Sequence, residues 1–242
     1  MSDSRVILLT ACIAPGGMSK TVLQDQNVRL VQYKQALDYY LKTTKNKIVF
    51  VENTGFDISL GYQEYVKVGR LEVLTFEGNS YDKRLGKGYG EALIIDYGLK
   101  NSKLIKEAKD IIKITGRLIV KNINQLLHHS RTGNVYCNLV KASSRAQTCY
   151  SIFFCAPKEF YTKYFLENIG MINDELTYYF EHYLNDCCHK WENDGNRWKE
   201  FWIPILICGQ SGTSGTEYRI SYTMYIKQLA RFILHKCGIY FF

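Results

Sequence analysis

The fold of this chain is decided by two apolar runs, RVILLTACIA at residues 5–14 and KIVFVE at residues 47–52. Apolar residues follow one another in both runs, which indicates strands that are buried on both faces. Between them, apolar residues recur at helical spacing over residues 27–41. A strand, a helix and a second buried strand form the repeating unit of a parallel α/β sheet.

The same unit continues to about residue 120. Further strands are predicted over residues 71–76 and 110–120, the latter broken at Thr115–Arg117, and helices over residues 62–68, 91–99 and 102–106. A glycine-rich loop, Gly86–Gly90, precedes the second of these helices. The expected fold class is therefore α/β, with a Rossmann-like, mostly parallel sheet flanked by helices. Ligands of such sheets bind beyond the carboxyl ends of the strands.

The second half of the chain is less regular. Strands are predicted over residues 151–155 and 203–208, and helices over residues 158–168, 174–188 and 222–236. We expect residues 1–130 to form an α/β part and residues 131–242 to form a mixed part with a C-terminal amphipathic helix, within one continuous globular unit.

Four short segments carry a resemblance to a known family. The run VFVENTGFD at residues 49–57 looks like the VVDNxSxD segment of nucleotide-sugar enzymes, with Glu52 in the acidic place. The segments GKGYGEA, KITGR and SGTSG look like small glycosyltransferases of capsule and O-antigen gene clusters. The chain thus resembles bacterial glycosyltransferases of the glycosyltransferase A (GT-A) fold. This implies a nucleotide-sugar donor, UDP-linked by expectation, and a glycan or lipid-linked glycan acceptor in surface polysaccharide synthesis.

One departure from the family concerns the cofactor. The position of the metal-binding DxD motif holds Thr115, Gly116 and Arg117. A divalent metal, Mn²⁺ or Mg²⁺, is therefore not supported by a standard motif, and no metal ligand is assigned. Arg117 would supply a planar donor fork for the departing diphosphate instead. A structural salt bridge is the alternative for Arg117.

Six residues are candidates for donor binding, because the predicted topology places them at the carboxyl edge of the sheet: Thr10, Glu52, Lys87, Lys113, Thr115 and Arg117. Glu52 would accept hydrogen bonds from the nucleoside, or would be a solvated charge at a strand end. Lys87 lies among three glycines, which allow close backbone approach to phosphate, or would sit in a flexible loop.

Candidates for the general base share the helix predicted over residues 174–188. Glu181 and His182 flank its apolar face, where a carboxylate or imidazole could take the proton of an acceptor hydroxyl, or could face solvent. Asp174 could serve in the same way or cap the helix. Ser211, Gly212, Thr213 and Ser214 follow an apolar strand and could bind a phosphate or a sugar hydroxyl, or form a tight turn.

Composition narrows the partners and the location. The net charge of +8 suits phosphorylated ligands or an anionic membrane surface, and no nucleic-acid motif is present. The 8 cysteines form no CxxC pair, which is typical of free thiols in a reducing cytosol. No stretch is long enough to span a bilayer. The expectation is a cytoplasmic protein, with peripheral contact to the inner face of the membrane through the basic, apolar helix at residues 222–236.

Two alternatives remain open. The chain could be a non-catalytic nucleotide- or glycan-binding protein on the same fold. It could also be a nucleotidyltransferase, which would need a metal-binding pair of carboxylates that the sequence does not reveal.

Overall fold

The computed structural model describes residues 4–18, 21–142 and 146–218, with residues 220, 223, 225, 226, 229, 230, 233 and 234. Its helices are α1 (Gln26–Thr43), α2 (Gln63–Lys67), α3 (Gly86–Asn101), α4 (Lys103–Glu107), α5 (Ile123–His129), α6 (Lys158–Phe160) and α7 (Phe180–Asn193). Its strands are β1 (Arg5–Ala11), β2 (Lys47–Glu52), β3 (Leu71–Thr75), β4 (Asp110–Thr115), β5 (Ile119–Val120), β6 (Val135–Tyr136), β7 (Leu139–Ala142), β8 (Ala146–Cys149), β9 (Phe153–Pro157), β10 (Trp198–Lys199), β11 (Ile207–Gln210) and β12 (Glu217–Tyr218).

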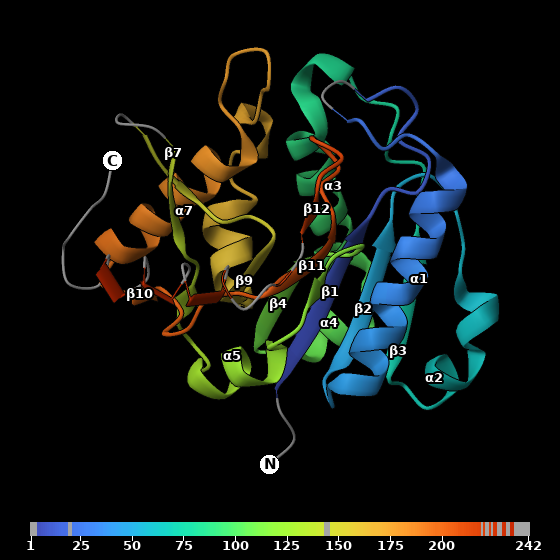
Figure 1. Cartoon of the computed structure of the whole chain (residues 1–242), viewed down its shortest axis with the longest axis horizontal. Coiled ribbons are helices and arrows are strands. Elements are labelled where there is room, and N and C mark those ends of the chain that lie inside the picture. Colours follow the sequence, from blue (N-terminus) through green and yellow to red (C-terminus); the bar gives the residue numbers. More distant parts are fainter. Residues whose placement is uncertain are drawn as a thin grey trace.

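A seven-stranded sheet in the order β10-β6-β9-β4-β1-β2-β3 forms the centre of the molecule (Figure 1). Strands β4, β1, β2 and β3 are parallel, and β9 is antiparallel to both β4 and β6. The predicted α/β class with a mostly parallel sheet is confirmed. Because β1 pairs with β2 on one side and β4 on the other, its carboxyl end lies at the middle of the sheet edge.

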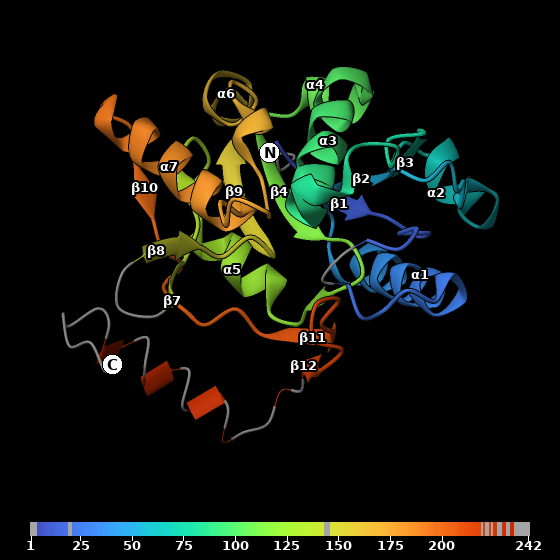
Figure 2. The ribbon, with the colours of Figure 1, turned by 90° about the horizontal axis from the view of Figure 1, so that it is seen from above.

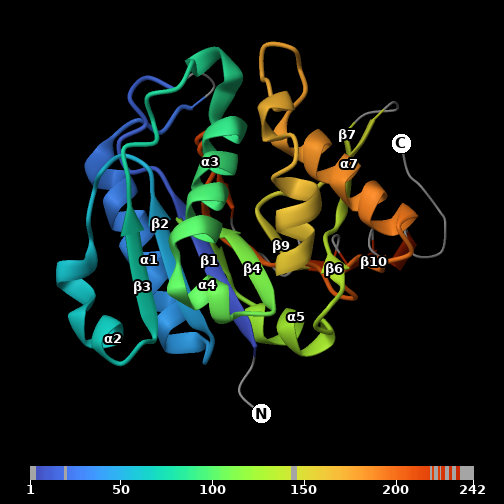
Figure 3. The same cartoon turned by 180° about the vertical axis from the view of Figure 1, so that it is seen from behind.

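Helices cover both faces of this sheet. Viewed from above, α1 and α5 lie on one side, and α3, α4, α6 and α7 lie on the other (Figure 2). Alternate residues of β1 explain the two layers, because Ile7 packs in the core with α1 and Leu8 packs in the core with α3 and α7. Both side chains are fully buried. The view from behind shows α3 and α4 in front of the sheet (Figure 3), where α3 contacts β1 and β2 and α4 contacts β2.

Several predicted boundaries were wrong. Residues Gly86–Gly90 are not a loop. They form the first turn of α3, a long helix that packs directly on the sheet. The helix predicted from Asp174 begins only at Phe180, after a turn in which Asn173 and Tyr178 pair through their backbones. Strand β11 begins at Ile207 rather than at residue 203.

The second half of the chain adds strands to the central sheet, and β7 and β8 pair in a separate two-stranded sheet. Strands β6, β9 and β10 extend it beyond β4, so the division predicted at residue 130 does not separate two sheets. A smaller sheet in the order β12-β11-β5 joins the end of the described chain to the segment after β4. Most of the predicted helix at residues 222–236 lies outside the described residues, and its membrane contact stays a prediction.

No helix in the described ranges is both long and apolar enough to cross a membrane.

Candidate functional site

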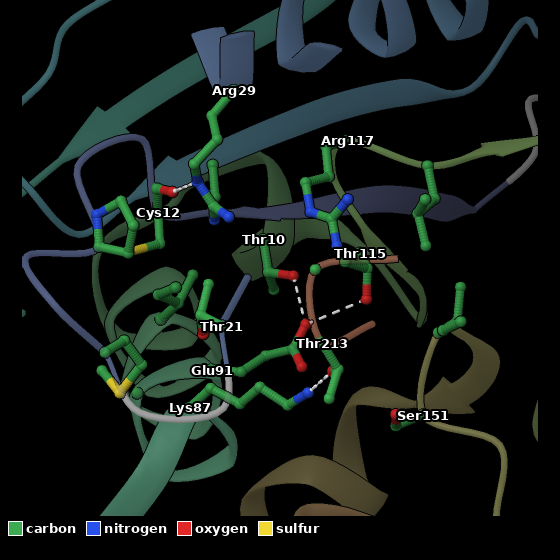
Figure 4. A pocket seen from close by; sticks show the side chains of 18 of the residues that line it. Thr10, Cys12, Thr21, Arg29, Lys87, Glu91, Thr115, Arg117, Ser151 and Thr213 are labelled. Atoms are coloured by element: carbon green, nitrogen blue, oxygen red, sulfur yellow. Dashed lines mark hydrogen bonds between the residues drawn. The ribbon is translucent and has the colours of Figure 1, made fainter. Parts of the chain in front are cut away.

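A cavity of about 240 Å³ opens at the carboxyl ends of β1 and β4. The elements that wall it are the ends of these strands, the first turns of α1, α3 and α7, and the turn at residues 211–213 (Figure 4). This is the place where parallel α/β sheets hold ligands, because no helix crosses the strand ends there. The site residues therefore come from distant parts of the chain.

Seven of the predicted donor or loop residues line this cavity: Thr10, Lys87, Thr115, Arg117, Ser211, Gly212 and Thr213. Glu181 lines it as well. The structure thus brings together residues from both halves of the chain. Their roles in binding or catalysis stay predictions.

Arg117 enters the cavity from the segment that follows β4. It is almost fully buried and donates a hydrogen bond to the carbonyl oxygen of Gln210. Burial lowers the pKa of the Arg117 guanidinium, and the nearby charge of Arg29 lowers it further. A Cβ atom at residue 212 would lie 2.6 Å from Nη2 of Arg117, so a larger residue there would displace the guanidinium.

Arg29 is a second buried guanidinium in the same cavity, and the sequence analysis missed it. Its nitrogens donate to the carbonyl oxygens of Cys12 (2.8 Å) and Leu23 (3.2 Å) and to the hydroxyl of Tyr33 (3.2 Å). Arg29 and Tyr33 are four residues apart on α1, so they share one helix face. The four-residue spacing between Arg29 and Tyr33, next to the apolar positions of this helix, is the sequence signal that could have revealed Arg29.

Neither arginine forms an ion pair with a carboxylate in the described part of the chain. Their partners are carbonyl oxygens and a neutral hydroxyl, which carry only partial charges. A buried charge is costly unless an opposite charge compensates it. Lys87 adds a third cation at the rim, where its ammonium donates to the hydroxyl of Thr213. The cavity is therefore suited to an anionic ligand.

Glu91, on α3, is a cavity residue that the sequence analysis also missed. Its Oε1 lies 2.7 Å from the ammonium of Lys113 and accepts hydrogen bonds from Thr10 (2.7 Å) and Thr115 (3.3 Å). Burial alone would raise the pKa of Glu91, but the charge and hydrogen bond of Lys113 and the two threonine hydroxyls lower it. Glu91 is thus an ionised carboxylate with its charge already balanced.

Lys113 does not line the cavity, although the sequence predicted it to bind the donor. Its side chain is 0% exposed, and its ammonium lies behind the cavity wall. The strand alternation explains this, because Lys113 and Thr115 point to the α3 side of the sheet and α3 covers Lys113. We revise its role from ligand contact to support of the wall.

Glu52 is likewise buried and is not a cavity residue. Its carboxylate accepts hydrogen bonds from the backbone N–H groups of Ile13 (2.8 Å), Thr54 (2.8 Å) and Phe56 (2.9 Å). The predicted contact between Glu52 and a nucleoside is corrected accordingly. Glu52 ties the loop after β1 to the turn after β2 and so shapes the cavity from behind.

The three candidates for the general base separate in the structure. Glu181 lies in the cavity, and its Oε1 accepts a hydrogen bond from the Ser151 hydroxyl at 2.6 Å. His182 is outside the cavity, and its Nδ1 accepts from the backbone N–H of Tyr179 at the start of α7. Asp174 packs against Gly86, where a Cβ atom would come within 2.0 Å of its carboxylate carbon. His182 and Asp174 thus do not line the cavity, and their roles as general base stay predictions. The N-cap of α7 is Tyr179 and not Asp174.

Ser214 is the remaining predicted loop residue, and it faces away from the cavity. Its backbone N–H donates to the Ser211 hydroxyl, which closes the turn at residues 211–216. Ser211 and Thr213 remain on the cavity side. The tight turn that the sequence analysis gave as an alternative is therefore present, and it also forms part of the cavity wall.

Nucleophilic catalysis by the cavity thiol does not fit this site. Burial raises the pKa of Cys12 to about 11, although the Arg29 charge acts in the opposite direction. A thiol in this state is protonated at neutral pH, and the thiolate is the reactive form.

The residues present do not fit a divalent metal. The cavity offers two carboxylates, and the Oε1 of Glu91 is already occupied by an ammonium and two hydroxyls. In the described part of the chain, no group of three or more His, Cys, Asp or Glu side chains could hold a metal ion. We therefore assign no metal-dependent step to these residues.

Comparisons with solved structures support the fold. The chain is similar to the inositol-1-phosphate CTP transferase from T. maritima, with 12% identity, a TM-score of 0.50, and 96% of this chain and 97% of that chain covered. It is also similar to the 4-diphosphocytidyl-2C-methyl-D-erythritol synthase from Anaerococcus prevotii, with 10% identity, a TM-score of 0.46 and coverage of 94% and 96%. A nucleoside-diphosphate-sugar pyrophosphorylase from Vibrio cholerae matches with 12% identity, a TM-score of 0.44 and coverage of 81% and 91%.

At this level of identity, the likeness shows the fold alone. The chain has a mixed α/β fold with a mostly parallel sheet flanked by helices, as the sequence analysis predicted, and this fold is similar to that of the T. maritima CTP transferase. No protein-family model matches the sequence, and no curated protein matches it.

Proposed function

We propose that this protein is a transferase that binds a nucleotide-activated sugar, UDP-linked by expectation, and passes the sugar to a glycan or lipid-linked glycan acceptor. One observation carries the proposal: Arg29 and Arg117 are buried in one cavity at the carboxyl edge of the sheet and have no carboxylate partner in the described chain. A diphosphate supplies the missing negative charge. Guanidinium groups bind such oxygens with paired, charge-assisted hydrogen bonds.

The reaction follows from this placement. An acceptor hydroxyl attacks the anomeric carbon of the sugar, and the bond between that carbon and the diphosphate oxygen breaks. The hydroxyl proton passes to the carboxylate of Glu181. Arg117, Arg29 and Lys87 stabilise the charge that develops on the leaving diphosphate. The turn at Ser211–Thr213 contributes hydroxyl and N–H donors beside it.

The location of the acceptor is a further part of the proposal. A lipid-linked acceptor would bring the enzyme to the inner face of the cytoplasmic membrane, and the basic segment at residues 222–236 would assist this contact. Surface polysaccharide synthesis is the setting in which such acceptors are used. No nucleic acid partner is proposed.

Nucleotidyl transfer is the second candidate, because the structural neighbour with a TM-score of 0.50 is described as a CTP transferase. An anion-binding cavity would serve the triphosphate of CTP as well as it serves a nucleotide-sugar. A non-catalytic nucleotide-binding protein is the third candidate. The three differ in the products that they release.

The first test is a thermal-shift series with UDP, GDP, CMP, CTP and dTDP, each with Mn²⁺ and with chelator. A bound nucleotide raises the melting temperature by mass action. Matched reactions then separate the candidates: a nucleotide-sugar with acceptor releases the nucleoside diphosphate, whereas CTP with a sugar phosphate releases pyrophosphate. Pyrophosphate release would favour nucleotidyl transfer, and binding without either product would favour the binding protein. No shift with any nucleotide or nucleotide-sugar would overturn the proposal.

A further inference from the structure

A set of hydrogen bonds runs along the cavity wall from the end of β1 to the start of α7. It passes from Thr10 to Glu91, Lys113, Ser151 and Glu181, with donor–acceptor distances of 2.6–2.7 Å at every step. Figure 4 shows Thr10 and Glu91 on one side of the cavity and Ser151 on the other. The set joins elements from both halves of the chain.

Lys113 is the centre of this set. A lysine ammonium has three donors, and all three have acceptors here: Oε1 of Glu91 (2.7 Å), the carbonyl oxygen of Ser151 (2.6 Å) and the Thr115 hydroxyl (3.2 Å). The ring of Phe180, the residue before Glu181, lies 5.4 Å from the ammonium. Lys113 therefore holds both the Ser151 backbone and the first residue of α7.

Ser151 passes this position on to Glu181. With its carbonyl oxygen held by Lys113, its hydroxyl donates to Oε1 of Glu181 at 2.6 Å. The backbone of the next residue is also fixed, because Thr115 N–H donates to the carbonyl oxygen of Ile152. One carboxylate oxygen of Glu181 is thus oriented by Ser151, and no hydrogen bond to Oε2 is recorded in the described chain.

We propose that Ser151 and Lys113 are positioning residues that orient the Glu181 carboxylate toward an acceptor hydroxyl in the cavity. The inference rests on the proposed function for the identity of the acceptor, since Glu181 acts there as the general base. Ser151 and Lys113 do not touch the reacting atoms. They hold one oxygen of the carboxylate so that the other faces the substrate.

Other charges around the cavity also act on Glu181. Lys87 and Glu91 reach the cavity from α3, Arg29 from α1, and Arg117 from the segment after β4. His182 is its neighbour on α7 and faces Tyr179. Because none of these groups changes when the Ser151 hydroxyl is removed, a Ser151 variant isolates the effect of that one hydrogen bond.

The test compares Ser151→Ala, Ser151→Thr and the double variant Glu91→Gln/Lys113→Met in the full chain. Crystal structures of the variants and the wild type give the orientation of the Glu181 carboxylate. Ser151→Ala should let this carboxylate turn away from its wild-type orientation, because the hydrogen bond that holds Oε1 is lost. Ser151→Thr should keep the wild-type orientation, and the double variant should change it in the same direction as Ser151→Ala.

Kinetics give the second measurement. In Ser151→Ala, we expect kcat to fall ~10-fold with an unchanged KM for the donor, and in Ser151→Thr we expect kcat to stay near the wild-type value. The same orientation of the Glu181 carboxylate in Ser151→Ala and wild type would overturn the inference. A wild type without transfer activity would instead remove the proposed function, and the crystal structures would still decide the role of Ser151.

Discussion

Buried cations at the two sides of the cavity are satisfied in different ways. Lys113 has a carboxylate, a carbonyl oxygen and a hydroxyl around its ammonium, so its charge is balanced within the protein. Arg29 and Arg117 have only neutral acceptors. The comparison teaches that burial and charge alone do not mark a binding residue. A buried cation that lacks an internal counterion is the stronger candidate, because an external anion would supply the missing charge.

The largest effect should come from removing Lys113, whose charge is balanced within the protein. Lys113→Met leaves the Glu91 carboxylate without its counterion in a largely buried place, which should lower the free energy of unfolding by about 4 kcal/mol. Urea denaturation measures this loss. The matched variant Glu91→Gln/Lys113→Met removes both charges and should recover most of the stability. If the single and double variants were equally stable, Lys113 and Glu91 would not form a balanced pair.

Replacing an arginine that lacks a counterion should change the activity instead of the stability. Arg117→Ala should reduce turnover ~10²-fold or more, because the leaving diphosphate loses a charge-assisted donor. Its stability without ligand should stay near that of the wild type, since a buried charge without counterion is removed. Steady-state kinetics and thermal melting separate the two effects. Arg117→Lys keeps the charge but lacks the planar guanidinium, so its turnover should lie between those of Arg117→Ala and the wild type. A wild-type rate in Arg117→Ala would remove Arg117 from the mechanism.

Glu52 extends the comparison, because it is itself a buried anion that has only neutral partners. Its three backbone N–H donors and the Thr54 hydroxyl surround the carboxylate. Glu52→Gln turns one acceptor into a donor that faces these N–H groups, so the free energy of unfolding should fall by about 2 kcal/mol. The thermal shift caused by nucleotide should persist in this variant. Its complete loss would return Glu52 to the ligand-contact role.

Acid should give the smallest effect. The native pKa of Glu91 is lowered, so its contribution to stability is fully present above the ordinary glutamate pKa of about 4.3 and is lost as the pH falls through the lower native value. The stability of the wild type should therefore decline more steeply below pH ~4.3 than that of Glu91→Gln/Lys113→Met. Urea unfolding between pH 3 and pH 6 measures both slopes. Parallel curves would show that Glu91 does not carry this dependence.

The sequence was a good guide to the strands and a poor one to the second half. Consecutive apolar residues marked β1, β2 and β4 correctly, because a strand buried on both faces leaves no other pattern. The two-residue strands β6 and β10 left no periodic signal, since their pairing depends on β9 and on each other. The GKGYG run was interpreted as a loop because glycine disfavours helices, yet close packing of α3 against Phe180 and Asp174 requires it there.

The candidate site, like the fold, could be predicted only in part from the sequence. Arg117 could be placed in the cavity from its position after a strand end. Glu52 and Lys113 could not be separated from true cavity residues, because strand order sets the edge of the sheet but not which side chain a neighbouring helix covers. Arg29 was hidden in a helix that the apolar pattern already explained.

The order in which the cavity wall is made has a consequence for biosynthesis. Arg117 is held by Gln210, 93 residues later, and Lys87 by Thr213, 126 residues later. A ribosome that adds roughly 5–20 residues per second exposes the central strands many seconds before it supplies these last contacts. The nascent chain can thus pair β1, β2, β3 and β4 while Arg117 still lacks its Gln210 partner, whereas the partners of Arg29 are all made early. The cavity wall is complete only when the turn at residues 211–213 has emerged.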